Sequence, residues 1–174
     1  MLLEEELSLA VKSQNGDKAA LGALWDAITP KLYGYLVNTL RDRQSAEDIL
    51  QNTWLKAVES IGSFRPRGVR FSAWLFAIAK NECRQHWRAQ KFAEPITENH
   101  ADNLRDNTRA DITEKLYLEN ILKRLTEDEQ ELLRLRYISG FSFNEIAKIL
   151  NISAIAARVR IHRAIARVRA GLNN

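Results

Sequence analysis

The sequence predicts an all-α protein made of two small helical domains that are joined by a flexible acidic linker. The 174-residue chain contains only seven glycines and three prolines, so few positions would break a helix. Apolar residues recur at steps of three and four, which is typical of amphipathic helices, and no stretch shows the strict alternation of a half-buried strand. These observations favour a helical architecture over an α/β enzyme fold.

The domain boundaries follow from a change in composition in the middle of the chain. Residues 93–114 contain Pro95, several Asn and Asp residues and few large apolar side chains. Such a segment cannot bury enough apolar surface to offset the entropy lost on ordering, so we interpret it as the linker. The predicted domains are therefore residues 1–92 and residues 115–174.

Four helices are expected in the first domain. Ser45, together with Asp48, and Ser72 supply short polar side chains that can accept hydrogen bonds from the free N–H groups of a first helical turn. Between the last two helices, Gly62–Arg70 contains two glycines, a proline and three arginines, which is typical of an ordered, turn-rich loop. Apolar periodicity predicts the four helices near Leu3–Asn15, Lys18–Leu40, Ser45–Ile61 and Phe71–Lys91.

The second domain contains the most specific local pattern, which predicts a helix-turn-helix. Two capping boxes begin helices at Thr126–Glu129 and Ser142–Glu145, and the first helix is expected to run through Tyr137. The second helix is short, Asn151–Ser153 turns the chain, and another helix follows. Ile152 is expected to fill the corner between these two helices.

The final helix of this pattern is strongly basic. Beyond the turn the sequence carries five arginines and no acidic residue. The second helix of a helix-turn-helix enters the major groove with its N-terminal half, where Arg158 and Arg160 could reach base edges or phosphates. His162, Arg163 and Arg167 lie where contacts to the DNA backbone are expected. The alternative is a structural helical hairpin with a solvated basic face.

The helix expected at Phe71–Lys91 carries a second basic face. Its apolar residues follow the spacing of one buried stripe, which begins at Phe71. A different face carries cations around an aromatic residue, and Trp87 could stack there on an unpaired base while the cations hold phosphates. The alternative is a partly buried Trp87 on an ordinary solvated face. The residues of this face are Lys80, Arg84, Trp87, Arg88 and Lys91.

Composition and motifs indicate no catalytic or metal centre. Cys83 is the only cysteine, and although Cys83 and His86 have the spacing of metal ligands, no four-ligand set can be composed with them. Because the sequence also lacks a glycine-rich phosphate loop and a Ser-His-Asp arrangement, we expect neither enzyme activity nor a cofactor. No apolar run approaches the roughly 18 residues that span a bilayer, and the acidic N-terminus is unlike a secretory signal. We therefore expect a cytoplasmic protein without membrane insertion.

Two separate blocks of the sequence resemble the extracytoplasmic-function sigma factors of bacterial RNA polymerase. Ala46–Ala57 (AEDILQNTWLKA), Phe64-Arg-Pro and Phe71–Asn81 (FSAWLFAIAKN) are similar to sigma region 2. Leu125 through Arg169 is similar to sigma region 4 and includes the phrase FSFNEIAKILNIS, which begins at Phe141. The blocks follow the family's order and spacing, so the match is more specific than a helix-turn-helix alone.

The resemblance implies a sigma factor that binds core RNA polymerase and promoter DNA, both duplex and unpaired, and that is controlled by an anti-sigma protein. In this family a polar helix face of region 2 docks on the polymerase, and the matching residues here are Asp48, Gln51 and Asn52. The alternative is that these three residues form an ordinary solvated helix face. The loop before the next helix captures an unpaired base of the minus-ten element, and that helix adds further contacts. Phe64 could equally fill the core, and the loop arginines could anchor phosphates without reading sequence. The matching residues are Phe64, Arg65 and Arg67 in the loop and Lys80, Asn81 and Arg84 on the helix, beside Trp87 and Arg88.

In region 4 the resemblance implies recognition of the minus-thirty-five element by the basic final helix. The chain departs from the family's usual Gly-Thr-Val-Lys-Ser-Arg run, because it has Ile155-Ala-Ala-Arg-Val-Arg160 at these positions. We expect DNA binding to survive this departure and the preferred sequence to differ. Two other classes of protein remain open: a stand-alone helix-turn-helix regulator that binds duplex DNA as a dimer, and an adaptor that binds polymerase without reading DNA.

Overall fold

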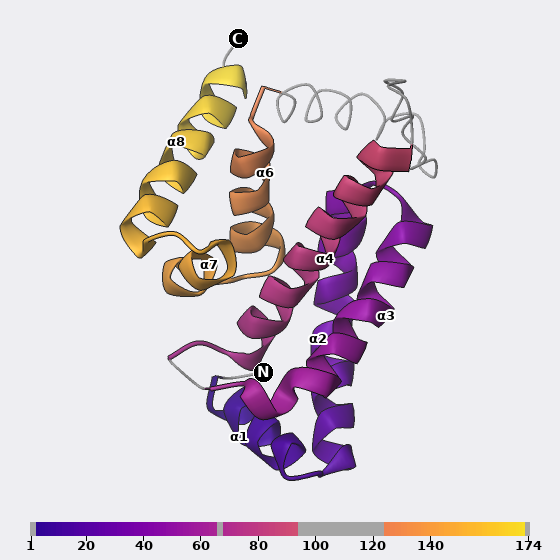
Figure 1. Cartoon of the computed structure of the whole chain (residues 1–174). Helices are drawn as coiled ribbons and strands as arrows, with labels where there is room; N and C mark the ends of the chain where they lie inside the picture. Colours follow the sequence, from indigo (N-terminus) through magenta and orange to yellow (C-terminus); the bar gives the residue numbers. More distant parts are fainter. Residues whose placement is uncertain (1–2, 66–67, 94–123, 173–174) are drawn as a thin grey trace, which may run out of the picture.

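The computed structural model describes residues 3–65, 68–93 and 124–172, and within them it confirms the all-α prediction (Figure 1). These residues form helices and turns and no strand. None of the described helices is long and apolar enough to cross a membrane. The expected linker, residues 93–114, lies outside the described residues except for Ala93, the last residue of a helix.

The helices of the first domain lie close to their predicted positions. They are α1 (Leu3–Gln14), α2 (Lys18–Leu40), α3 (Arg43–Ser60) and α4 (Phe71–Ala93), with a 3-10 turn at Ile61–Ser63. In Figure 1, α2, α3 and α4 run side by side, and α1 packs across one end of α2.

Two predicted helix starts are wrong. Ser45 does not begin α3, because the carboxylate of Asp42 caps this helix by accepting a hydrogen bond from the Ser45 backbone N–H at 2.8 Å. Ser72 does not cap α4 either. The Ser72 backbone N–H lies in the first turn of α4 and donates to Oε2 of Glu6 at 2.8 Å, so a buried carboxylate of α1 satisfies it.

An aromatic cluster joins the helices of the first domain. The ring of Trp54 in α3 lies 4.8 Å from Trp25 of α2 and 6.4 Å from Phe71 of α4, measured between centroids. Trp54 and Phe71 are fully buried, and such pairs contribute about 0.5 to 1.5 kcal/mol beyond the area they bury. The α3 and α4 surfaces are therefore held at a defined distance from each other.

The second domain has the predicted helix-turn-helix geometry. It contains α6 (Glu127–Leu133), a π-helical turn (Arg134–Ile138), α7 (Phe143–Leu150) and α8 (Ala154–Leu172). Both predicted capping boxes are present, at the starts of α6 and α7. Asn151 adopts a left-handed conformation with φ of 53° that ends α7, and the half-buried Ile152 packs against the core.

The two domains pack against each other, which the sequence did not predict. Figure 1 shows α7 beside α4, and Phe141, just before α7, meets Phe76 of α4 edge to face at 4.7 Å between ring centroids. The hydroxyl of Tyr35 in α2 donates to Oε1 of Glu131 in α6. Leu132 and Leu135 belong to the same buried cluster as the first domain's core residues. The hydrophobic core is therefore continuous from one domain to the other.

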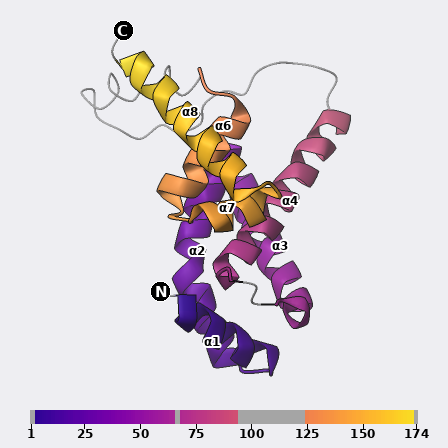
Figure 2. The same cartoon turned by 90° about the vertical axis from the view of Figure 1, so that its left-hand side faces the viewer.

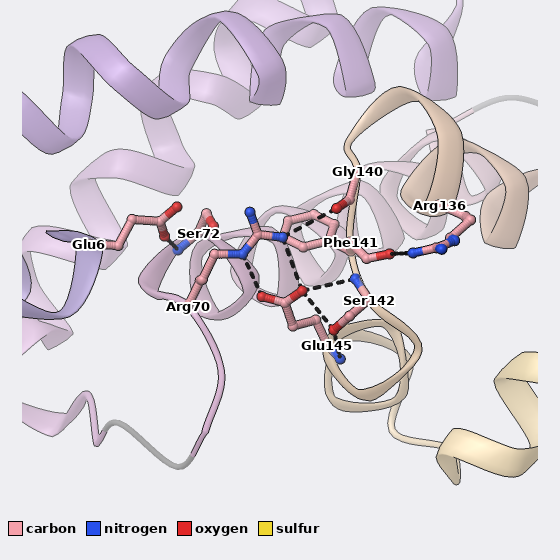
Figure 3. Close-up of polar contacts among 8 residues, drawn as sticks. All are labelled: Glu6, Arg70, Ser72, Arg136, Gly140, Phe141, Ser142 and Glu145. Atoms are coloured by element: carbon pink, nitrogen blue, oxygen red, sulfur yellow. Dashed lines mark hydrogen bonds and ion pairs between the residues drawn. The ribbon is translucent and has the colours of Figure 1, made fainter. Parts of the chain in front are cut away.

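A polar contact beside Phe141 ties the same two domains together (Figure 3). Arg70 Nε donates to Glu145 Oε1 at 2.6 Å, and Arg70 Nη2 donates to Glu145 Oε2 at 3.0 Å. Glu145 also completes the capping box with Ser142. Burial alone would raise the pKa of Glu145, but the hydrogen bonds from Arg70 and Ser142 outweigh burial and hold this pKa below its ordinary value. The carboxylate therefore stays charged inside the domain interface.

Cys83 lies at this interface and can report on it. Its side chain is buried on α4, two turns beyond Phe76, and it interacts electrostatically with Glu131 and Arg134 of the second domain. Burial, with Glu131 acting in the same direction, raises the pKa of the Cys83 thiol to about 12. Because the thiolate is the reactive form, Cys83 should react slowly while the domains are packed.

Replacing Glu145 with Gln should loosen the domain interface and leave α7 intact, because Gln also completes a capping box but brings no charge to Arg70. Losing about 1 to 2 kcal/mol of charge-assisted hydrogen bonding should raise the population of separated domains about 5- to 30-fold. The rate at which a disulfide reagent labels Cys83 under native conditions measures this population, since the chain has one cysteine.

Glu59→Gln is the matched control, because it makes the same change at an exposed position of α3 and should label at the wild-type rate. An unchanged labelling rate in Glu145→Gln, with helical content intact, would contradict the role of the Arg70–Glu145 contact.

Candidate nucleic-acid and protein interfaces

The polar face predicted on α3 is exposed in the structure. Asp48, Gln51 and Asn52 are all exposed, and their spacing aligns them along one side of the helix. Leu55 follows them on the same side with 59% of its surface exposed, whereas Trp54 beside it is buried. Sequence reasoning missed Leu55, although its helical spacing from Asp48 and Gln51 was a usable signal. The face therefore combines polar groups with one large apolar contact.

The loop before α4 is partly core and partly surface. Phe64 is 2% exposed and packs against Phe71 and Trp74, at 5.3 Å and 5.4 Å between ring centroids. The sequence left two interpretations open for Phe64: a ring that captures a base, or a ring that fills the core. In the structure the ring fills the core, so it is not accessible to a base while the two domains are packed against each other. Arg65 is exposed, and its Nη1 donates to the carbonyl oxygens of Gly62 and Phe64. The predicted Arg67 lies outside the described residues.

Helix α1 holds this loop in place, which no sequence signal indicated. Gln14 Nε2 donates to the carbonyl oxygens of Ile61 and Phe64, both at 2.8 Å. Glu6 of the same helix accepts the hydrogen bond from Ser72 where the loop enters α4. The loop is thus fixed near both ends by one helix, which restricts the positions that Arg65 can reach.

The residues of the basic face predicted on α4 differ in their exposure to solvent. Asn81, Arg84, Trp87 and Arg88 are exposed, and Figure 2 shows the C-terminal end of α4 projecting beyond the other helices. Lys80 is half buried. Burial lowers the pKa of its amine, and this effect outweighs the opposing influence of Glu131 and Asp128 in the second domain. Lys80 therefore interacts electrostatically with the second domain, whereas the other residues of this face that the structure describes are open to solvent.

The basic helix α8 lies on the outside of the molecule. In Figures 1 and 2 it packs on α6 and α7, on the side away from α2, α3 and α4. Arg158, Arg160, His162 and Arg163 are exposed. Arg167 is also exposed, but its Nη1 donates to both carboxylate oxygens of Glu129 at 2.6 Å and 2.8 Å. Since exposed ion pairs contribute little, about 0 to 1 kcal/mol, a phosphate could displace this carboxylate.

A groove of about 520 Å³ separates the loop from the helix-turn-helix. Its walls include Gly68 and Val69 on one side and Lys148, Asn151 and Ala154 on the other. Within the described residues, no three His, Cys, Asp or Glu side chains gather in a way that could hold a metal ion. These surfaces present cations, amides and exposed apolar side chains that a partner could bind.

Comparisons with known proteins match both domains. Residues 24–93 match the Sigma-70 region 2 family, and residues 115–168 match the Sigma-70 region 4 family. The chain is 31% identical over 159 residues to the RNA polymerase sigma factor CarQ of Myxococcus xanthus, which covers 90% of this chain and 91% of CarQ.

Another relative is longer than this chain. The ECF RNA polymerase sigma factor BldN of Streptomyces coelicolor is 27% identical over 165 residues, which covers 91% of this chain and 62% of BldN. The chain therefore spans less than two thirds of the length of that relative. Among solved structures, CnrH in complex with the cytosolic domain of CnrY is similar, with a TM-score of 0.73, 27% identity and 97% of both chains covered.

Replacing Gln14 with Glu should free the loop before α4, because a carboxylate of nearly the same size cannot donate to the carbonyls of Ile61 and Phe64. Two lost hydrogen bonds should lower the free energy of unfolding by about 1 to 3 kcal/mol. The Phe64 amide donates a hydrogen bond to the Ile61 carbonyl. Hydrogen exchange at this amide should accelerate by a larger factor than the decrease in the free energy of global unfolding would cause by itself. Gln85→Glu, at an exposed position of α4, is the control. Equal exchange at Phe64 in both variants would show that Gln14 does not hold the loop.

Proposed function

Because this chain belongs to the extracytoplasmic-function sigma factors of bacterial RNA polymerase, we propose that it binds the core enzyme and directs it to promoters with two unlike elements. The observation that carries this proposal is that one chain joins two matched segments, each with an exposed cationic helix, α4 in the first and α8 in the second. The proposed domains are residues 1–92 and 115–174, connected by residues 93–114. The catalytic step belongs to the polymerase, and the chain acts with it in the cytoplasm.

The polymerase-binding surface in this proposal is the exposed face of α3. Asp48, Gln51 and Asn52 can hydrogen-bond a partner, and Leu55 supplies apolar area at the same face. Interfaces of this composition are typical of specific protein–protein contacts, in which an apolar contact is surrounded by polar groups. Asn52 has no charge, so it contributes less electrostatic attraction than an acid would.

The minus-ten surface is the basic face of α4 with the loop before it. Arg84, Arg88 and the exposed Trp87 suit an unpaired strand, because an aromatic ring stacks on a base while cations hold the phosphates. Asn81 adds an amide that can donate and accept, and the exposed Arg65 extends the surface into the loop. Arg67 is assigned to this surface from the sequence alone. Phe64 supports the loop from inside the core. Lys80 is half buried and interacts electrostatically with Glu131 and Asp128 of the second domain.

The minus-thirty-five surface is α8. Its exposed cations are already on the outside of the molecule, so binding of duplex DNA there does not require the domains to separate. The residues that we assign to this surface are Arg158, Arg160, His162, Arg163 and Arg167.

An anti-sigma protein is the expected regulator. The family to which the chain belongs and the similarity to CnrH, solved with the cytosolic domain of CnrY, support this assignment. Such a protein would act by covering the α3 and α4 surfaces or by stabilising the packed arrangement of the two domains.

Adding the purified chain to core polymerase and sequencing the transcripts made from genomic DNA tests the proposed function. We expect initiation at a set of promoters that share two conserved elements at a fixed spacing, and none with core polymerase alone. A stand-alone regulator would instead protect a palindrome in the absence of polymerase and would initiate no transcription. That result would overturn the proposed function.

Replacing Asp48 and Gln51 with Ala together should weaken association with core polymerase while leaving thermal stability nearly unchanged, because exposed substitutions usually change stability by no more than about 0.5 kcal/mol. Fluorescence titration of labelled protein with core polymerase measures the dissociation constant. The control is Asp26→Ala with Gln85→Ala, which makes the same two changes at exposed positions of α2 and α4. Equal affinity of both double variants would remove α3 from the proposed interface.

A further inference from the structure

The side of α8 that points away from the protein is apolar at its N-terminal end. Ala157, Ile161 and Ala164 are buried and face the rest of the domain. With about 100° of rotation per residue, Ile155 and Val159 fall on the opposite side, one helical turn apart. Ile155 is 77% exposed and Val159 is 41% exposed. Two large aliphatic side chains thus form the crest of the helix that the proposed function assigns to DNA.

Arginines flank this apolar crest on both sides. Arg158 lies on one flank, and Arg160 and Arg163 lie on the other, while α8 carries no acidic residue. The guanidinium of Arg158 lies 5.2 Å from the centre of the Phe143 ring in α7, so it is held toward the side of the helix. The first two turns of the crest are therefore apolar, the exposed His162 follows on the same side in the next turn, and the flanks are cationic.

The start of α8 is well ordered, which fixes the direction of the crest. Ser153 Oγ accepts a hydrogen bond from the Ala156 backbone N–H at 3.0 Å, so the first turn is capped. The same turn carries Ile155. In Figure 2 this end of α8 lies against α7 and its outer side is uncovered by any labelled helix. A ligand can approach Ile155 and Val159 without any change in the packing of the domains.

We infer that Ile155 and Val159 read thymine through its 5-methyl group, while the flanking arginines hold the phosphates of the two strands. The inference rests on the proposed function, because it needs α8 in the major groove. That groove admits one helix, so the crest of the helix meets the base edges and its flanks meet the backbones. The thymine methyl is the apolar group displayed on that groove floor, and aliphatic side chains recognise it by contact. Because arginines flank the crest and α8 carries no acidic residue, the charge pattern of α8 favours DNA as the ligand that contacts the crest.

The expected size of the effect follows from burial of one methyl group. Removing such a group from water is worth about fourfold in affinity, so two contacted thymines should contribute about 16-fold together. Phosphate contacts differ in kind, because each one also releases counterions and makes the affinity salt-dependent. Residues that contact thymine methyl groups and residues that contact phosphates can therefore be distinguished in one set of affinity measurements.

The test uses the full chain bound to core polymerase and a promoter identified by transcript sequencing. Each thymine of the upstream element is replaced in turn by deoxyuridine, which lacks only the 5-methyl group. We expect one or two positions at which the replacement weakens binding about fourfold. Ile155→Ala should bind deoxyuridine and thymine equally at one of these positions, and Val159→Ala should do so at a neighbouring position.

Arg160→Ala is the contrasting variant. It should weaken thymine and deoxyuridine templates by the same factor and reduce the slope of log affinity against log salt by about 0.9, the value for one phosphate contact. Because Ile155 and Val159 are exposed, their Ala variants should keep the wild-type circular dichroism and melting temperature.

The outcomes separate this inference from the proposed function. Suppose that the assembled polymerase initiates at promoters. The inference is then overturned if deoxyuridine has no effect on binding at any position, or if replacing thymine by deoxyuridine weakens binding of Ile155→Ala and of the wild-type chain equally at every position. The proposed function stands in either case. If no promoter-specific initiation occurs, the proposed function fails and this inference fails with it.

Discussion

The contact of Arg70 with Glu145, beside the packing of Phe141 on Phe76, determines how the two domains are arranged. Arg70 lies where the loop enters α4, and Glu145 completes the cap of α7, so one ion pair joins the starts of two helices. Gly140 contributes its carbonyl to the same guanidinium, and its φ of 70° is a conformation that favours glycine. Charged, hydrogen-bonded groups inside an apolar interface favour one geometry over others, because displaced partners would remain buried and unpaired.

This arrangement affects the proposed binding surfaces unequally. The residues of the α3 face and of the α8 crest are exposed while the domains are packed. On the face of α4, Lys80 is half buried and interacts electrostatically with Glu131 and Asp128 of the second domain, whereas Arg84, Trp87 and Arg88 are exposed. Separation of the domains would therefore change the minus-ten surface more than the other two. A regulator that favours the packed arrangement would act mainly on this surface.

The N-terminal helix has a structural role that its position in the chain does not suggest. The matched region 2 segment begins at residue 24, whereas α1 ends at Gln14. Even so, Gln14 and Glu6 supply the hydrogen bonds that hold the loop and the first turn of α4. A buried carboxylate and an amide from α1 thus stabilise a surface formed by other segments. Their role depends on three-dimensional proximity rather than on membership in a motif.

The sequence by itself determined the approximate positions of the helices, the two capping boxes and the cationic character of α4 and α8. These features depend on interactions within one turn of helix, such as Ser142 with Glu145, so local residue types are sufficient to predict them. The cap of α3 was also local, and Asp42 was available in the sequence as its signal. Tertiary structure alone decided that Phe64 is buried, that Lys80 is half covered and that Glu6 caps α4. Each of these depends on partners many residues away, and the pattern of a single segment contains no information about which distant side chain will meet it.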